Sequence, residues 1–161
     1  MKIGIGYDSH RFVKNKPLIL GGIRIEHDWG LEGHSDGDVI VHAIIDSLVS
    51  PTLNKNIGEL FPDNSPEYKN ICSLTLLKKV HTLIVGAGYN IINTDVVFIS
   101  ETPKISPYTN KMKEVLAHYL VLPINAISIK GKSNENMGFI GRLEGAAAIA
   151  VSLLRLNKNI S

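Results

Sequence analysis

Apolar and polar positions alternate at the N-terminus of the chain as they do in a β-strand. Lys2 to Tyr7 form the first such stretch, and Pro17 to Ile25 form a second that Gly21-Gly22 interrupts with a turn or bulge signal. The pattern changes after Ser35-Asp36-Gly37-Asp38, where densely apolar residues follow polar capping residues and acidic charge. These positions predict a largely buried helix over about residues 38–49.

The rest of the chain continues this succession of helices and strands. Proline, asparagine and glycine concentrate between Pro51 and Pro66, and predict an irregular loop of the kind that often carries function. The pattern then predicts, in chain order, a helix from Ser73 to Gly86 or Gly88, a strand over Ile91–Ile99, a helix from Ser106-Pro107 through Tyr119 and a short strand from Ala126 to Ile129. The last segment, Ala146 to Leu156, fits a strand by its alternation and a helix by its alanines, so both stay open.

The chain is long enough for one hydrophobic core and too short for two ordinary domains. Its 161 residues are 44% hydrophobic, and no obvious linker divides them. We expect one domain over residues 1–157 and a short C-terminal tail over residues 158–161. Because strands and helices alternate, the expected fold class is α/β, built as an α+β sandwich.

Composition argues against several kinds of partner. The 17 Lys+Arg and 15 Asp+Glu residues leave a formal net charge of +2, with no long run of one sign that would indicate nucleic-acid or membrane-surface binding. No stretch approaches the ~20 apolar residues that span a bilayer, and Met1 to Phe12 lack the apolar core of a secretion signal. The single cysteine, Cys72, cannot form an internal disulfide or complete a cysteine zinc site, so a reducing cytoplasm is expected.

A carboxylate and an imidazole lie two residues apart at the N-terminal strand. Because side chains two apart in an extended segment point to one face, Asp8 and His10 are aligned as a pair of ligands. His42 is a candidate third ligand on the apolar helix, where Asp38 or Asp46 can lie beside its ring and fix its tautomer. Two imidazoles and one carboxylate suit zinc and leave one coordination position open. The alternatives are polar groups at a strand end and a hydrogen-bonded core histidine.

Several segments carry a resemblance to one known family. The strings IGIGYDSHRF, GLEGHSDGDVIVHAIIDSL, NIGELFPD, ETPK and NENMGFIGRLEG occur in the order and spacing typical of that family. Over essentially its whole length, the chain resembles the 2-C-methyl-D-erythritol 2,4-cyclodiphosphate synthases. The resemblance implies a mixed sheet covered by helices on one side, a homotrimer, and one zinc ion per subunit held by Asp8, His10 and His42.

The resemblance also implies residues that contact the methylerythritol phosphate part of the substrate. His34 and Ser35 contact this part, and Asp63 accepts its hydroxyl groups. The apolar lining of the same pocket is implied to be Ile57, Gly58 and Phe61. From the residues alone, Ser35 is an ordinary helix cap and Phe61 is an anchor packed on the core.

A second group of implied contacts lies toward the C-terminus. Glu135 holds a harder cation, magnesium or manganese, and Ser133, where the family usually has threonine, keeps a hydroxyl for a phosphate contact. The cytidine part is implied to be enclosed by Pro103, Lys104 and Ile105, with Lys132 nearby. From the residues alone, Glu135 is a solvated acid and Pro103-Lys104 is a structural turn. Asn56 and Asn136 depart from the family's usual acid and lysine, and are left out of the site.

The implied reaction is an intramolecular phosphoryl transfer of the non-mevalonate isoprenoid pathway. The 2-phosphate of 4-diphosphocytidyl-2-C-methyl-D-erythritol 2-phosphate attacks the β-phosphorus, CMP leaves and the 2,4-cyclodiphosphate forms. The implied active sites lie between subunits, with Phe139 and Arg142 among the contacts. Arg142 and Glu144 match a central cavity in which an isoprenoid diphosphate is a proposed ligand, and a solvent-exposed salt bridge is the alternative for this pair.

Two other activities are compatible with the same residues. A cation held by Asp8, His10 and His42 can activate water, which would make the chain a diphosphate hydrolase. The chain can also be a zinc-dependent module that binds nucleotides or isoprenoid phosphates without turnover. Glu135 beside the zinc ligands argues against this last reading.

Overall fold

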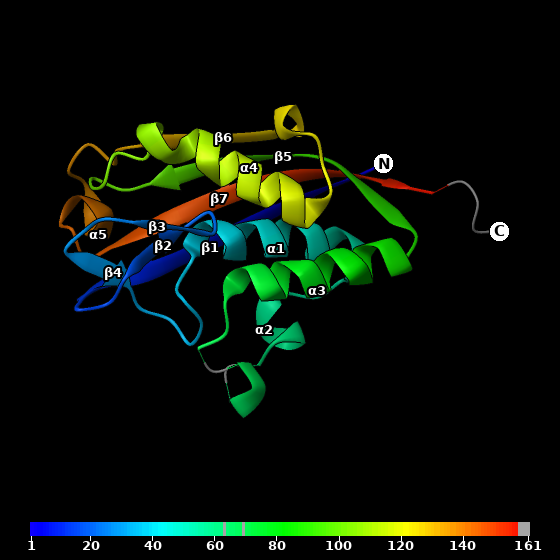
Figure 1. Ribbon diagram of the computed structural model, residues 1–161, viewed down its shortest axis with the longest axis horizontal. Helices are drawn as coiled ribbons and strands as arrows, with labels where there is room; N and C mark the ends of the chain where they lie inside the picture. Colours follow the sequence, from blue (N-terminus) through cyan, green and yellow to red (C-terminus); the bar gives the residue numbers. More distant parts are fainter. Residues whose placement is uncertain (63, 69, 158–161) are drawn as a thin grey trace.

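A five-stranded mixed sheet forms the centre of the computed structural model, which describes residues 1–62, 64–68 and 70–157 (Figure 1). The strand order is β4-β1-β7-β5-β6. β5 and β6 pair in parallel, whereas the other neighbours are antiparallel. The strands are β1 (Lys2–Lys14), β4 (Trp29–Leu31), β5 (Tyr89–Ile99), β6 (Ile127–Lys132) and β7 (Gly145–Leu156).

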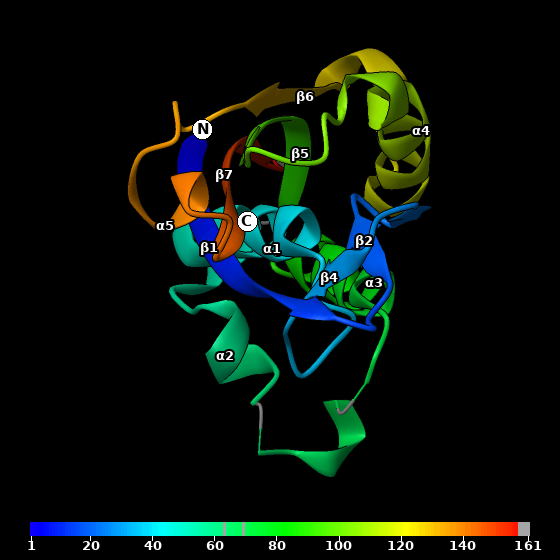
Figure 2. The same cartoon turned by 90° about the vertical axis from the view of Figure 1, so that its left-hand side faces the viewer.

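Three long helices lie on the same side of this sheet (Figure 2). α1 packs on β1 and β7, α3 packs on α1, and α4 contacts α3 and β6. These helices are α1 (Val39–Leu53), α3 (Ser73–Gly86) and α4 (Thr109–Leu120). The shorter elements are the strands β2 (Leu18–Leu20) and β3 (Ile23–Ile25), the helices α2 (Ile57–Leu60) and α5 (Gly138–Gly141), and the 3-10 turns η1 (Pro66–Tyr68), η2 (Ser106–Tyr108) and η3 (Ile124–Ala126). The predicted α+β class and its one-sided layer of helices are confirmed.

The side chains of β1 divide between the two faces of the sheet. Gly4 and Gly6 face α1, and a Cβ at either position would overlap the carbonyl oxygen of Ser47 or Ala43 in that helix. Glycine therefore lets the helix backbone approach the strand closely. The intervening residues point the other way, and their exposed fractions are high for apolar side chains: Ile3 72%, Ile5 66% and Tyr7 55%.

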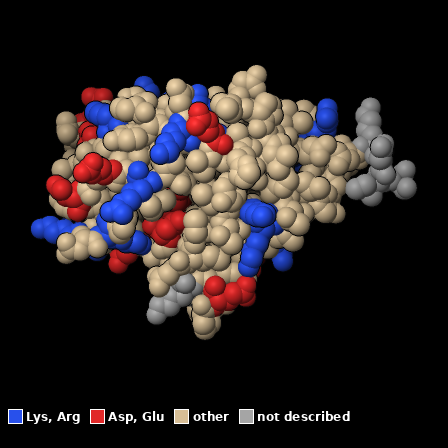
Figure 3. Space-filling model, in the orientation of Figure 1, with Lys and Arg blue, Asp and Glu red and all other residues tan. Residues whose placement is uncertain are grey.

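Charged side chains of both signs lie on the molecular surface. On the face in Figure 3, basic and acidic side chains are interspersed, and neither sign forms a continuous tract. Among the described residues, no helix combines the length and the apolar character that a bilayer crossing needs. The predicted tail, residues 158–161, lies outside the described residues.

Most predicted elements are present, with corrected bounds. The strand predicted to end at Tyr7 extends to Lys14, and the helix predicted from Ser106 begins as η2 and becomes α4 at Thr109. The irregular loop predicted from Pro51 is wrong at its start, because α1 continues to Leu53. Pro51 lies inside this helix and has no backbone N–H, so one helical hydrogen bond is missing. The Ser47 carbonyl that would accept this bond faces Gly4 of β1 instead. The loop also contains α2 and η1, which its composition did not predict.

The segment whose type stayed open, Ala146 to Leu156, is strand β7. It lies between β1 and β5 and pairs with both, so its backbone groups are satisfied along both edges. Ala146, Ala148 and Ala150 are buried, and their small side chains lie in the sheet on which α1 packs. Period-two burial and pairing on both edges outweigh the helix propensity of alanine here.

Asp38 connects the first helix to the β2–β3 turn. Its side chain is 0% exposed and accepts hydrogen bonds from the backbone N–H groups of Val41 at 3.1 Å, Gly21 at 2.9 Å and Gly22 at 2.6 Å. Burial and the nearby charge of Asp36 raise the pKa of Asp38 to about 6, so the carboxylate is mostly ionised at pH 7. One side chain thus caps α1 and fixes the glycine turn of the hairpin.

We predict that Asp38→Ala lowers the free energy of unfolding by about 2–4 kcal/mol, because it leaves several buried N–H donors without an acceptor. Chemical denaturation of the two proteins measures this difference. The matched control is Asp28→Ala at an exposed aspartate, which should change stability by less than ~0.5 kcal/mol. Equal effects of the two substitutions would contradict the assigned role of Asp38.

Candidate active site

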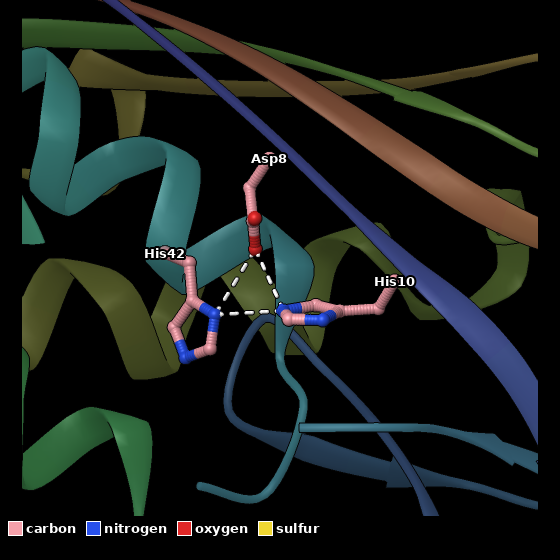
Figure 4. A group of neighbouring side chains, drawn as sticks. All are labelled: Asp8, His10 and His42. Atoms are coloured by element: carbon pink, nitrogen blue, oxygen red, sulfur yellow. Dashed lines mark hydrogen bonds and ion pairs between the residues drawn. The ribbon is translucent and has the colours of Figure 1, made fainter. Parts of the chain in front are cut away.

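Asp8, His10 and His42 bring one donor atom each to a common point (Figure 4). Asp8 Oδ2 lies 2.8 Å from His10 Nε2 and 3.0 Å from His42 Nδ1, and the two nitrogens are 3.0 Å apart. Asp8 and His10 come from β1, and His42 comes from α1. The predicted convergence of these side chains is confirmed, and the donor set fits a divalent cation.

Local structure explains why these side chains meet. In β1, Gly4, Gly6, Asp8 and His10 share the face that looks toward α1, since side chains alternate along a strand. The glycines bring the helix close, and His42 lies on the turn of α1 that passes Asp8. His42 is 8% exposed, whereas Asp8 and His10 are partly open to solvent. The donors therefore form the floor of an accessible site.

The electrostatics of the cluster favour positive charge between the donors. Burial favours the neutral form of Asp8, but hydrogen bonds and charge from His10 and His42 outweigh it and hold the pKa of Asp8 well below its usual range. Burial likewise opposes a charged His42, yet the hydrogen bond and negative charge of Asp8 raise the pKa of His42. A bound cation would take the place of the shared protons, so metal binding to this cluster should release protons.

The second nitrogen of His42 has partners that differ from those predicted. His42 Nε2 lies 2.9 Å from Ser35 Oγ and 2.9 Å from Ser73 Oγ. Among the described residues, neither Asp38 nor Asp46 hydrogen-bonds the His42 ring, so the prediction that one of them fixes its tautomer is wrong. Each carboxylate accepts backbone hydrogen bonds elsewhere. Asp38 caps α1, and Asp46 Oδ1 accepts a hydrogen bond from the N–H of Ile57 at 2.7 Å. Burial raises the pKa of Asp46.

A cavity of about 700 Å³ opens above the three donors. It collects most of the residues predicted to contact the methylerythritol part, namely His34, Ser35, Ile57, Gly58 and Phe61. Ser35 turns its hydroxyl toward His42 and Ser73, while His34 is exposed at the rim. Tyr68, Ile71 and Leu76 also line this cavity and were not predicted. Asp63, predicted to accept hydroxyl groups, lies outside the described residues.

The residues predicted to contact cytidine line a different cavity. This cavity is about 100 Å³, and its lining includes Pro103, Lys104, Ile105, Lys132 and Ser133. It has no lining residue in common with the larger cavity. In one chain, therefore, the predicted site residues form two separate groups.

Glu135 lies in a tightly held loop after β6. Ser133 Oγ donates a hydrogen bond to Glu135 Oε1 at 2.9 Å. Glu101 Oε1 accepts from the backbone N–H groups of Asn134 at 2.9 Å and Asn136 at 3.1 Å, which fixes the loop on both sides of Glu135. Sequence reasoning assigned no role to Glu101, and its place in the string ETPK was the available signal.

Phe139 and Arg142 lie at the short helix α5 and its end. Phe139 is 39% exposed. Arg142 Nε donates to Glu144 Oε1 at 2.6 Å, and both side chains are largely open to solvent. This hydrogen bond and charge raise the pKa of Arg142, and the same contact lowers the pKa of Glu144. In a single chain the pair is the exposed salt bridge that the sequence left as an alternative.

This chain is similar to known proteins along nearly its whole length. The family model described as "YgbB family" matches residues 1–155. The 2-C-methyl-D-erythritol 2,4-cyclodiphosphate synthase of Caldicellulosiruptor bescii is 52% identical over 153 residues, covering 95% of this chain and 98% of the relative.

The fold is also similar to that of solved structures. The bifunctional IspDF from Campylobacter jejuni superposes with a TM-score of 0.92 at 36% identity, over 96% of this chain and 42% of that one. A Plasmodium falciparum IspF in complex with CDP superposes with a TM-score of 0.85 at 34% identity, over 98% of this chain and 97% of that one. The chain belongs to the YgbB family, the family of the 2-C-methyl-D-erythritol 2,4-cyclodiphosphate synthases.

Proposed function

We propose that this chain is a 2-C-methyl-D-erythritol 2,4-cyclodiphosphate synthase, a phosphorus–oxygen lyase of the non-mevalonate isoprenoid pathway. It converts 4-diphosphocytidyl-2-C-methyl-D-erythritol 2-phosphate into the 2,4-cyclodiphosphate and CMP. The convergence of Asp8, His10 and His42 at the floor of a 700 Å³ cavity, in a chain of this family, carries the proposal. A cytoplasmic location fits a chain with a single cysteine.

Asp8, His10 and His42 would hold a zinc ion. Two imidazole nitrogens and one carboxylate oxygen suit a borderline cation, and three protein ligands leave a position for substrate. When bound there, zinc supplies Lewis-acid polarisation of a phosphoryl oxygen. The cavity residues beside the donors then bind the methylerythritol part: His34 and Ser35 offer polar contacts, and Ile57, Gly58 and Phe61 exclude water. Asp63, which lies outside the described residues, would accept hydroxyl groups by the resemblance alone.

The reaction needs positioning more than acid–base chemistry. A phosphate monoester has a second pKa near ~6, so its attacking oxygen is already largely ionised at pH 7 and needs no general base. This oxygen forms a bond to the β-phosphorus, the bond from the β-phosphorus to the bridging oxygen breaks, and CMP leaves with the electron pair. The chain must therefore hold the two groups in line.

The second group of residues would hold the diphosphate and the cytidine. Glu135 is a carboxylate for a harder cation, magnesium or manganese, which neutralises diphosphate oxygens when it is bound. Ser133 orients Glu135 through a hydrogen bond and offers its hydroxyl to phosphate. The residues that would enclose the cytidine part are Pro103, Lys104, Ile105 and Lys132.

Assembly into a homotrimer would join the two groups. The larger and smaller cavities share no lining residue, which supports active sites in which the first group of one subunit adjoins the second group of the next. The exposed apolar residues Ile3, Ile5 and Tyr7 on the helix-free face of the sheet support this packing. Phe139 and Arg142 would then lie toward the trimer interior, where Arg142 suits an isoprenoid diphosphate as ligand.

The proposed function predicts a cyclic product. Incubation with the cytidyl substrate, zinc and magnesium in ¹⁸O-labelled water should yield CMP and an unlabelled cyclodiphosphate by mass spectrometry. A linear bisphosphate that carries ¹⁸O would assign a hydrolase instead, and unchanged substrate would indicate binding without turnover. In the same assay, His42→Ala should lose far more turnover than Lys132→Ala. His42 belongs to the metal cluster, whereas Lys132 lines the smaller cavity and its side chain is exposed.

Oligomerisation generates a separate prediction. Light scattering should give a mass about three times the 17.6 kDa of one chain. Ile5→Glu, which places like charges together at the proposed interface, should lower that mass and cut the cyclase rate by ~10-fold or more. Leu83→Glu on the outer side of α3, at a site 44% exposed, should leave both unchanged. An Ile5→Glu protein with wild-type mass and rate would contradict the proposed interface.

A further inference from the structure

Ser73 links the metal cluster to a carboxylate that the reaction does not use. Ser73 is the first residue of α3 and is 0% exposed. Its backbone N–H donates to Asp36 Oδ2 at 2.9 Å, and its hydroxyl makes a short hydrogen bond to Asp36 Oδ1. The same Oδ1 accepts from the N–H of Asp38 at 3.2 Å. These contacts hold the Asp36 carboxylate and the Ser73 hydroxyl in a fixed relation to each other.

The direction of each hydrogen bond follows from the chemistry of the groups. The oxygens of a carboxylate accept hydrogen bonds, so the Ser73 hydroxyl donates its proton to Asp36. The lone pairs of Ser73 Oγ therefore remain for His42 Nε2, which lies 2.9 Å away. Two acceptors at this distance would repel, so the contact requires a proton on His42 Nε2. When a cation replaces the proton that His42 Nδ1 shares with Asp8, the neutral ring keeps its proton on Nε2 and Nδ1 offers its lone pair to the cation.

Ser35 does not impose this direction. Its Oγ is also 2.9 Å from His42 Nε2, and it lies 3.4 Å from both Ser73 Oγ and the N–H of Gly37. A hydroxyl in that setting can rotate to donate or to accept. The carboxylate behind Ser73 is thus what distinguishes the two serines.

We propose that Asp36 and Ser73 form a positioning relay that keeps the proton of His42 on Nε2 and presents Nδ1 to the cation. Neither residue touches the cation or the substrate in this arrangement; both act through His42. The relay rests on the metal site of the proposed function and adds positioning residues to it. The relay also connects the start of α3 to α1. A displacement of Ser73 would therefore alter the contact that orients the His42 imidazole.

The test is the metal affinity of Ser73→Ala, measured by competition between the protein and a chromogenic chelator with zinc and with cobalt(II). Loss of a partner behind a ligating histidine typically weakens metal affinity by ~10–100-fold, and we expect a loss in that range. The matched control is Ser47→Ala, because Ser47 is also 0% exposed and its hydroxyl contacts Ile44 O at 2.7 Å and Ser152 Oγ at 2.6 Å. This control should lose stability while keeping wild-type metal affinity.

Asp36→Asn provides a second variant that keeps the size of the side chain. Its amide can donate to Ser73, which turns the hydroxyl proton toward His42 and opposes the required tautomer, so metal affinity should again fall. In ¹⁵N-histidine NMR spectra of the zinc-loaded proteins, the Nε2–H proton of His42 should exchange slowly in wild type and Ser47→Ala, and faster in both relay variants. Denaturation of the metal-free proteins separates this effect from a general loss of fold.

The outcomes separate the relay from the metal site. Wild-type protein that binds no divalent cation would overturn the metal site and the relay together. Wild-type protein that binds metal, with Ser73→Ala and Asp36→Asn within about twofold of its affinity, would overturn the relay and leave the proposed function standing. A selective loss of affinity in the two relay variants, with Ser47→Ala unchanged, supports the relay.

Discussion

The close contact between α1 and β1 determines where His42 lies relative to Asp8 and His10. Gly4 and Gly6 have no side chain on the face of β1 that looks toward the helix, so the helix backbone approaches the strand at these positions. The next residues on that same face are Asp8 and His10. A larger residue at either glycine would move the helix away from the strand, and the donor atoms would separate with it. The metal cluster is therefore a consequence of how the strand and helix pack.

Local sequence patterns predicted the parts of the site that depend on local geometry. The two-residue spacing of Asp8 and His10 sets them on one side of an extended segment, whatever the rest of the fold. His42 was a candidate third ligand because it lies on the apolar helix, and the resemblance assigned it to the same metal site. The structure confirms the convergence. The role predicted for Asp38 and Asp46 was wrong, because helical spacing shows which residues share a face and does not show what else competes for a carboxylate. Backbone N–H groups outside α1 donate hydrogen bonds to both carboxylates.

Other features depend on contacts between segments far apart in the chain. Ser73 and Asp36 meet across 37 positions, and no periodicity links them. β7 was ambiguous because its strand character comes from pairing with β1 and β5, which a single segment does not reveal. The same limitation applies to the division of the site residues into two cavities. The resemblance predicted members of each group, whereas their separation within one chain is a property of the fold.

We propose that Asp8, His10 and His42 coordinate one zinc ion in the folded protein. X-ray absorption at the zinc edge of the loaded protein tests this coordination, because imidazole ligands give a recognisable multiple-scattering pattern. We expect a shell of nitrogen and oxygen donors at ~2.0–2.2 Å with two imidazoles and no sulfur. A shell without imidazole, or one that includes the sulfur of Cys72, would contradict the account.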